Sequence, residues 1–290
     1  MNLEVSDIKN YFKERKSNCN KGDFGKVGIL GGSINYTGSI KLAYYGTSAM
    51  RSGAGIVRLI IKKDIAKYVI PNILEETIFI LENNLEESIK NLDALAIGMG
   101  WQQTKENEEI LKFILKNYKG KLVIDADGLN ILANNLNWLK DSKAKIVLTP
   151  HIKEFSRLIK IDIEEILKNK EFYVQKFTNE YNVILLLKGE RTIIADKNNF
   201  YKVNKGCAGM ATAGSGDVLS GILVGMLGYN NYNLLTVAAG AYLNGLAGEL
   251  AQNKNTDIAM IASDTIKFIP DAIKMIREEL KMDVKDNIWR

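Results

Sequence analysis

Hydrophobic positions along the chain follow two alternating patterns. Short unbroken runs of aliphatic and β-branched residues, each ended by glycine or polar residues, are typical of strands buried in a parallel sheet. These runs predict strands at residues 27–30, 56–61, 77–81, 94–97, 122–124, 146–148 and 183–187. Apolar residues at helical spacing lie between them and predict helices at 38–52, 64–69 and 106–118. In the last of these helices, Ile110, Phe113, Ile114 and Tyr118 share one face.

The pattern changes after residue 187. Two short apolar runs, 192–195 and 200–203, flank the polar residues 196–199 and predict a β-hairpin. The remainder is helical in pattern, with helices expected at 217–227, 234–252 and 263–280. Strands that alternate with helices predict an α/β fold, a three-layer α/β/α sandwich around a mostly parallel central sheet. No linker, repeat or compositional break appears, so we expect one domain over residues 1–290, with 1–20 as an N-terminal extension.

Five of these seven predicted strands end in glycine or polar residues. In open α/β sheets, ligands bind at the carboxyl ends of the strands, so this clustering predicts a ligand site at one edge of the sheet. The five strand ends are Gly31-Gly32-Ser33, Gly98-Met99-Gly100, Asp125-Ala126-Asp127, Thr149-Pro150-His151 and Lys188-Gly189.

Composition narrows the classes of function. The net charge of +5 is spread along the chain, so we expect no nucleic-acid partner. The two cysteines, Cys19 and Cys207, stand outside any CxxC pattern, and the single histidine excludes a multi-histidine metal site. The N-terminus carries no secretory signal, and the longest apolar stretches fall short of the ~18 residues of a membrane span. A cytoplasmic protein without a membrane partner is therefore expected.

The glycine-rich segment NKGCAGMATAGSGDVLSG, residues 204–221, leads directly into an apolar helix. Glycines such as Gly214 and Gly216 allow close backbone approach, and a helix N-terminus offers free N–H groups, so the segment predicts an anion site. It matches neither the Walker pattern nor GxGxxG. Asp217 fits two interpretations equally well: an ordinary first-turn acid, or a general base acting on a hydroxyl that attacks a phosphate.

Three other strand ends carry candidate residues. The turn Lys188–Thr192 is either a simple connection or a clamp on a nucleotide phosphate. Asp125 and Asp127 either bind Mg²⁺ through water, or Asp127 caps the next helix. Asn130 contacts a ligand or a neighbouring strand end. Pro150 fits the first turn of the following helix, which places His151 near that helix start as a ligand contact rather than a proton carrier.

These motifs occur in an order that resembles the ADP- or ATP-dependent NAD(P)H-hydrate dehydratases of the ribokinase-like superfamily. The matching blocks run from about Lys21 to the C-terminal helices: KGDFGKVGILGGSINYTGS, AMRSGAGIV, AIGMG, DADGLN, TPHIKEF, LLKGERT and GMATAGSGDVLSGIL. The resemblance implies a ribokinase-like fold and a hydro-lyase that restores NADH or NADPH from the S-epimer of the hydrated form. In the implied reaction, ADP or ATP phosphorylates the ring hydroxyl, phosphate is then expelled, and AMP or ADP is released.

The resemblance also implies roles for individual residues. Asp217 corresponds to the base that contacts the hydrated nicotinamide. The other assigned contacts are Ser39, Gly100 and His151 to the hydrated dinucleotide, and Lys188, Gly189, Glu190, Arg191, Thr192 and Gly216 to ADP or AMP; Gly214, Asp127 and Asn130 are secondary candidates. Mg²⁺ is implied as a cofactor, with no direct protein ligand assigned. A homo-oligomer, with a tetramer favoured, and a separate epimerase are the implied partners.

Three residues depart from the family pattern: Ser39 replaces alanine, Met99 replaces a common proline, and Lys153 replaces glycine. Two alternatives remain. One is a kinase of the same fold for a vitamin alcohol, similar to hydroxyethylthiazole kinase, which would release the phosphorylated alcohol. The other is a nucleotide-binding regulatory module without turnover. The blocks KGDFG and TPHxxEF argue against the first, and retention of Asp217 argues against the second.

Overall fold

The computed structural model describes residues 1–45, 48–72, 78–81 and 84–286. Its strands form one sheet in the order β3-β2-β1-β4-β5-β6-β7-β8-β9. The strands are β1 (Lys26–Leu30), β2 (Ile56–Ile61), β3 (Ile78–Leu81), β4 (Ala94–Ile97), β5 (Lys121–Ile124), β6 (Lys145–Leu148), β7 (Ile184–Leu187), β8 (Thr192–Ala195) and β9 (Phe200–Val203). Neighbours from β3 to β7 are parallel, whereas β8 and β9 add as the expected antiparallel hairpin.

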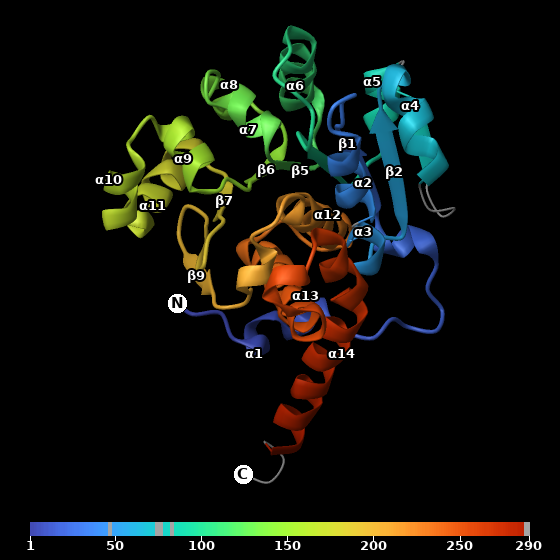
Figure 1. The fold of residues 1–290 in the computed structure, drawn as a ribbon, viewed down its shortest axis with the longest axis vertical. Coiled ribbons are helices and arrows are strands. Elements are labelled where there is room, and N and C mark those ends of the chain that lie inside the picture. Colours follow the sequence, from blue (N-terminus) through green and yellow to red (C-terminus); the bar gives the residue numbers. More distant parts are fainter. Residues whose placement is uncertain (46–47, 73–77, 82–83, 287–290) are drawn as a thin grey trace.

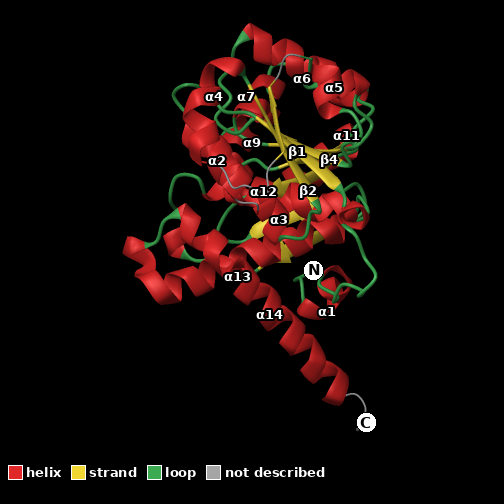
Figure 2. Ribbon diagram, turned by 90° about the vertical axis from the view of Figure 1, so that its right-hand side faces the viewer, coloured by secondary structure: helices red, strands yellow, loops and turns green. Residues whose placement is uncertain are grey.

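Helices cover both faces of the sheet (Figure 2). The α-helices are α1 (Val5–Ile8), α2 (Thr37–Tyr45), α3 (Ser48–Arg51), α4 (Lys63–Val69), α5 (Leu85–Ile89), α6 (Lys105–Asn117), α7 (Asp127–Leu132), α8 (Asn137–Lys140), α9 (Ile152–Ile159), α10 (Ile163–Lys168), α11 (Lys170–Tyr181), α12 (Ser215–Tyr229), α13 (Leu234–Ala259) and α14 (Ala262–Asp286). Short 3₁₀ turns are η1 (Lys9–Tyr11), η2 (Lys21–Phe24), η3 (Ile70–Asn72) and η4 (Ala208–Met210). Figure 1 places these elements along the chain.

Side-chain alternation along the strands separates two apolar cores. Ile29 and Ala96 belong to the core beneath α2, α12 and α13, whereas Leu30 and Ile97 belong to the core beneath α6, α7 and α9. Successive strand residues point to opposite faces, so a sheet that is apolar at every position must be covered on both sides. This arrangement confirms the predicted three-layer sandwich.

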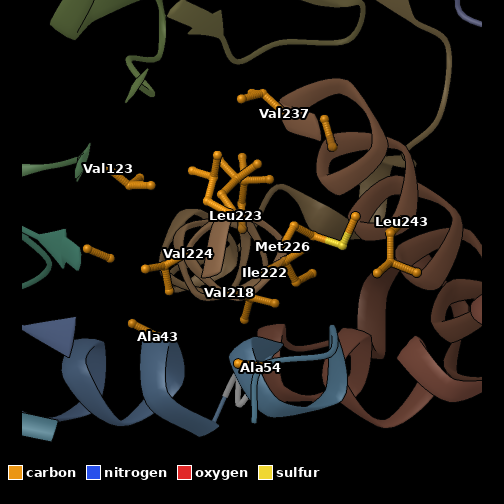
Figure 3. Packing of buried hydrophobic residues seen from close by; sticks show 14 of the residues in the cluster. Ala43, Ala54, Val123, Val218, Ile222, Leu223, Val224, Met226, Val237 and Leu243 are labelled. Carbon is orange, nitrogen blue, oxygen red and sulfur yellow. The ribbon is translucent and has the colours of Figure 1, made fainter. Parts of the chain in front are cut away.

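The helix α12 is the centre of the first core. Residues Val218 to Gly228 are all buried, and the helix packs against α2, α3, α13 and the sheet (Figure 3). Glycines permit this close packing: a Cβ added to Gly228 would lie only 2.5 Å from Val27 Cγ1. A helix that is apolar on all sides is expected only where it is surrounded by protein.

Several predicted helices differ in detail. The segment expected as one helix at 38–52 forms α2 and α3, and residues 46 and 47 between them lie outside the described residues, as does Thr77 of the predicted third strand. In α6 the fully buried apolar positions are Leu111, Ile114 and Leu115, while Ile110 and Phe113 are only partly buried. The predicted face, Ile110, Phe113, Ile114 and Tyr118, does pack against the core, and Leu111 and Leu115 extend it.

The helix α13 is longer than predicted. Among the described residues it is the one helix that is long and apolar enough to cross a membrane by length and composition, which the prediction from its sequence had excluded. However, 83% of its apolar window is buried in this fold. Packing against α12 and α14 explains its apolar character.

The outer edge of β9 is covered by the chain's first residues. Leu3 N donates to Lys202 O at 2.9 Å, and Lys202 N donates to Met1 O at 2.8 Å. Asn2 and Lys202 thus form an isolated parallel bridge next to the hairpin.

The turn after β4 requires glycine at position 98. Gly98 has φ +112°, and a Cβ there would lie 2.1 Å from the backbone oxygen of Asp125. Gly98→Ala is expected to lower the free energy of unfolding by about 3 kcal/mol, because neither strain nor backbone overlap has room to relax. Gly38, in α2, has no neighbour within 4 Å of an added Cβ. Gly38→Ala should therefore leave stability unchanged or raise it by up to about 1 kcal/mol, and urea unfolding of both variants tests the contrast.

Candidate active site

The N-terminus of α12 lies against the ends of β5 and β7. Gly214 precedes the helix with φ +92°, a conformation that favours glycine, and starts the turn that exposes the first helical N–H groups. A Cβ on Gly216 would lie 3.3 Å from Lys188 Nζ and 3.5 Å from Asp125 Oδ2. Because Gly216 has no side chain, the start of α12 can lie close to the ammonium of Lys188. A helix N-terminus beside a cation is the arrangement of an anion site.

A buried network holds that cation. Lys188 Nζ donates to Asp125 Oδ1 at 2.8 Å, and Ser220 Oγ donates to Asp125 Oδ2 at 2.8 Å. Asp125 also accepts from Ala126 N at 2.9 Å, and it is only 1% exposed. Both carboxylate oxygens are therefore engaged, so Asp125 acts as an anchor for Lys188 rather than as a ligand-binding group.

Glu154 provides a second carboxylate near Lys188, at 3.8 Å from Nζ. Desolvation lowers the pKa of Lys188, but the nearby Asp125, Glu154 and Asp217 outweigh it and hold this pKa above its ordinary value. Lys188 thus remains a permanent positive charge. Its side chain is about one-fifth exposed, so the ammonium is accessible to a ligand while it stays paired.

Asp217 lies in the first turn of α12, beside this pair. Burial and the negative charge of Asp125 raise its pKa to about 7, although a hydrogen bond from Ser39 and the charge of Lys188 oppose the shift. A carboxyl with a pKa near neutrality exchanges a proton readily under ordinary conditions. Asp217 is an acid in the first turn of α12, and its raised pKa also suits a general base, so its catalytic role stays a prediction at this point.

Gly100 and Ser39 join the same site from the other side. A Cβ on Gly100 would lie 2.8 Å from Ser39 Cβ and 2.7 Å from Tyr36 Cβ, so the loop after β4 is in close contact with the start of α2. Ser39, the departure from the usual alanine, adds a hydroxyl that hydrogen-bonds to Asp217. The structure thus brings Ser39, Gly100, Gly216 and Asp217 together, as the sequence predicts.

His151 is the N-cap of α9 and lies beside Lys188. Its Nδ1 accepts from Lys153 N and Glu154 N, both at 3.1 Å, so in the neutral ring the proton resides on Nε2. Burial and the charge of Lys188 lower the pKa of His151, which favours this neutral form. Pro150 precedes the cap, so its predicted place in the first turn was wrong; its carbonyl accepts from Lys188 N at 2.8 Å.

Asp127 and Asn130 face a different set of partners. Asp127 follows the cap position Ala126, so the predicted helix cap was wrong, and its carboxylate accepts from Gln102 N at 2.7 Å. Asn130 Oδ1 accepts from Arg157 at 3.0 Å. Asp125 is paired with Lys188 and Asp127 with Gln102, so the two aspartates have separate partners, and their joint binding of Mg²⁺ through water stays a prediction. The described residues also contain no cluster of three or more potential metal-binding side chains.

The turn between β7 and β8 is the most open part of the site. Gly189, Glu190 and Arg191 are exposed, and Thr192 Oγ1 donates to Gly189 O at 3.3 Å. Within the described part of the chain, no hydrogen bond joins these three residues to the Lys188–Asp125 pair. Their expected nucleotide contacts therefore stay a prediction.

The sequence does not identify two residues of the site. It indicates Asp125 only as a Mg²⁺ ligand and assigns no role to Ser220, although the position of Ser220 carries a signal. Ser220 is a polar residue in an otherwise apolar helix and lies three positions after Asp217, hence on the same helical face. A buried hydroxyl there needs a partner, and Asp125 provides it.

Comparisons with known proteins agree with this geometry. The chain is 32% identical over 99% of its length to a protein of Moorella thermoacetica named bifunctional NAD(P)H-hydrate repair enzyme, covering 56% of that protein. It is 31% identical to the ADP-dependent (S)-NAD(P)H-hydrate dehydratase of Nitrosopumilus maritimus, covering 94% of this chain and 96% of the relative. The chain thus spans about half the length of the bifunctional relatives it matches and nearly all of the shorter one.

A solved structure shares the fold. The ADP/ATP-dependent NAD(P)H-hydrate dehydratase of Bacillus subtilis, co-crystallised with ATP and Mg²⁺, superimposes with a TM-score of 0.83 at 24% identity, covering 94% of this chain and 97% of that one. The family model for NAD(P)H-hydrate dehydratases matches residues 27–271, which include every residue of the site described above. The chain therefore belongs to the NAD(P)H-hydrate dehydratase family, within a ribokinase-like fold.

Proposed function

We propose that this chain catalyses the ADP-dependent dehydration of the S-epimer of hydrated NADH or NADPH, with ATP as an alternative donor. The observation that carries the proposal is the partly buried Asp217, with a pKa near 7, held beside Lys188 at a helix N-terminus. The name of the Nitrosopumilus relative supports ADP as the donor, and the Bacillus structure supports both nucleotides. The products are NADH or NADPH, inorganic phosphate, and AMP or ADP.

The geometry supports a two-stage reaction. Asp217 removes the proton from the ring hydroxyl, whose oxygen attacks the terminal phosphoryl group and displaces AMP or ADP. The lone pair of the ring nitrogen in the hydrated tetrahydropyridine then expels phosphate to give an iminium ion, and release of the proton on the adjacent ring carbon to solvent restores the double bond. Phosphate is a far better leaving group than hydroxide at neutral pH. Lys188 and the free N–H groups of α12 stabilise the negative charge that moves between the phosphates.

Magnesium, which the family implies, fits the site only as an ion carried by the nucleotide. Asp125, the most buried carboxylate among the described residues, already accepts three hydrogen bonds, and Mg²⁺ characteristically retains water and binds substrate phosphates. When bound there, the ion would neutralise phosphate charge. Lys188 and the start of α12 supply the protein's share of that neutralisation.

The direct test is an assay of hydrated NADH with ADP and ATP in parallel. Recovery of NADH absorbance, with stoichiometric release of phosphate and AMP or ADP, supports the proposal. A kinase of the same fold would instead leave NADH unrestored and accumulate a phosphorylated alcohol. A regulatory module would bind the nucleotide and release no phosphate.

The rate should depend on pH through Asp217. The carboxyl must be deprotonated to act as a base, and its pKa is raised to about 7, so kcat/KM should fall as the pH decreases below about 7. An ordinary aspartate would keep activity constant down to about pH 4. Steady-state rates between pH 5 and 9 locate this acidic limb. If kcat/KM stays constant down to pH 5, Asp217 is not the general base.

We further propose a homo-oligomer, with a tetramer favoured, and a separate epimerase that supplies the S-epimer. The corner between α13 and α14 supports self-association, since Ile258 is 92% exposed and Ile261 is 55% exposed there. The bifunctional names of relatives about twice as long support a second activity in the same repair process. Light scattering on the purified chain measures the oligomeric state.

A further inference from the structure

A second recess lies at the opposite end of α12 from Asp217. The helix runs from Ser215 to Tyr229, a rise of about 20 Å at 1.5 Å per residue, and Tyr229 forms part of the recess. Its volume is about 910 Å³. The walls come from the N-terminal segment, the end of α3, the end of α12 and one side of α14, and Figure 2 shows the N-terminal α1 close to α14.

The lining of this recess is strongly cationic. Two acidic residues, Glu14 and Asp23, stand against six basic ones: Lys13, Arg15, Lys16, Arg51, Lys274 and Arg277. The carboxylate of Asp23 accepts from the backbone and side-chain amides of Asn20. Among the described residues, no salt bridge involves any of the six cations. The described lining residues of the recess therefore carry a net positive charge.

Two of its arginines are already held in place. Arg15 donates to Gly53 O at 2.7 Å and lies 3.6 Å from the centre of the Phe24 ring. Arg277 donates from Nε to Phe12 O at 2.6 Å and from Nη2 to Lys13 O at 2.9 Å. Carbonyl groups and a ring orient a guanidinium without neutralising it, so both charges remain available. Their side-chain entropy is already lost before any ligand binds.

Both arginines line the same recess as Tyr229. Burial raises the pKa of Tyr229, and a hydrogen bond with Asn230 and the positive charges of Arg15 and Arg277 oppose that rise. Tyr229 is itself fixed, since its hydroxyl donates to Ser52 O at 3.0 Å. Fixed guanidinium groups that converge on a preformed hollow are the arrangement that recognises phosphate oxygens.

We propose that this recess is a second anion site, which binds a small molecule carrying two or more linked phosphate groups. Its volume lies within the range of small-molecule sites, and the spare N–H groups of Arg15 and Arg277 match the planar geometry of phosphate oxygens. Lys16 and Lys274 supply further charge at its rim. Because α12 separates it from Asp217, binding here is independent of the proposed reaction.

Isothermal titration of the full chain measures the number of sites. Inorganic tripolyphosphate and ADP serve as separate probes, since the first carries only the phosphates and the second adds a base and sugar. Wild type should bind ADP at two sites, and the double variant Lys16→Glu/Lys274→Glu at one, with at least a tenfold loss of affinity at the other. The same double variant should also lose one binding site for tripolyphosphate. If it loses a site for ADP but none for tripolyphosphate, the recess recognises the nucleoside and the phosphate assignment is wrong.

The matched control reverses two exposed lysines elsewhere, Lys119 and Lys176, which have no salt bridge among the described residues. Lys119→Glu/Lys176→Glu should retain two sites, so a general effect of net charge is excluded. One ADP site in wild type, or equal losses in both double variants, overturns the proposal. The hydrated-NADH assay runs alongside: the Lys16→Glu/Lys274→Glu variant should keep its turnover, so failure of either proposal is recognised separately.

Discussion

Asp217→Asn should reduce the turnover of hydrated NADH by roughly 10²–10⁴-fold, the range typical for loss of a general base. The amide keeps the size of the carboxyl and can still accept a hydrogen bond from Ser39, but it takes no proton from the substrate. Nucleotide binding should change little, because Lys188 and the helix N–H groups remain. The variant therefore separates the chemistry of the site from its affinity for phosphate.

Single-turnover kinetics and ADP titration measure these two quantities on the same preparation. Asp162→Asn is a suitable control, since Asp162 is an exposed acid before α10 whose side chain caps nothing. It should leave both quantities unchanged. If the turnover of hydrated NADH by Asp217→Asn is within a few-fold of the wild-type value, another group accepts the proton.

Asp125→Asn is expected to cost about 3–5 kcal/mol of unfolding free energy, as does the loss of one partner from a buried ion pair. Asp125 is only 1% exposed and pairs with Lys188 at 2.8 Å, so the variant removes the nearest negative charge and leaves Glu154, 3.8 Å away, and Asp217 beside the ammonium. Activity should fall as well, because the cation that faces the phosphates is no longer held in place.

Urea unfolding of Asp125→Asn beside Ser220→Ala tests this ranking. Ser220→Ala removes a single hydrogen bond to the same carboxylate and should cost only about 1–2 kcal/mol. Equal losses in the two variants would mean that the charge of Asp125 contributes nothing beyond its hydrogen bonds, contrary to the role assigned to it here.

The strand pattern was the most informative part of the sequence. All nine predicted strands are present, because a sheet covered on both faces requires continuous apolar runs that no other element needs at that length. The strand ends also predicted which residues share one edge of the sheet. Parallel strands place their carboxyl ends on one edge, so Gly100, His151 and Lys188 all lie along it, and His151 pairs directly with Lys188.

The interactions between those strand ends could not be predicted in the same way. The bond from Ser220 to Asp125 joins residues 95 positions apart, and no local pattern indicates which acid a buried serine will meet. The same limit explains Asp127, which follows a strand as a helix cap would but turns toward Gln102. His151 caps its helix through a ring nitrogen, a role that residue preferences assign to serine, threonine, aspartate or asparagine.

The short parallel bridge between residues 1–3 and β9 has a consequence for how molecules meet one another. A bare outer strand offers unpaired N–H and C=O groups, which can recruit the corresponding strand of another molecule and start an aggregate. In this fold, Met1 and Leu3 occupy those groups on Lys202, and an ion pair between Lys202 and Glu171 places charge beside them. Residues 1–3 therefore contribute to colloidal stability, because they occupy hydrogen-bonding groups on the outer edge of β9 that would otherwise be unpaired.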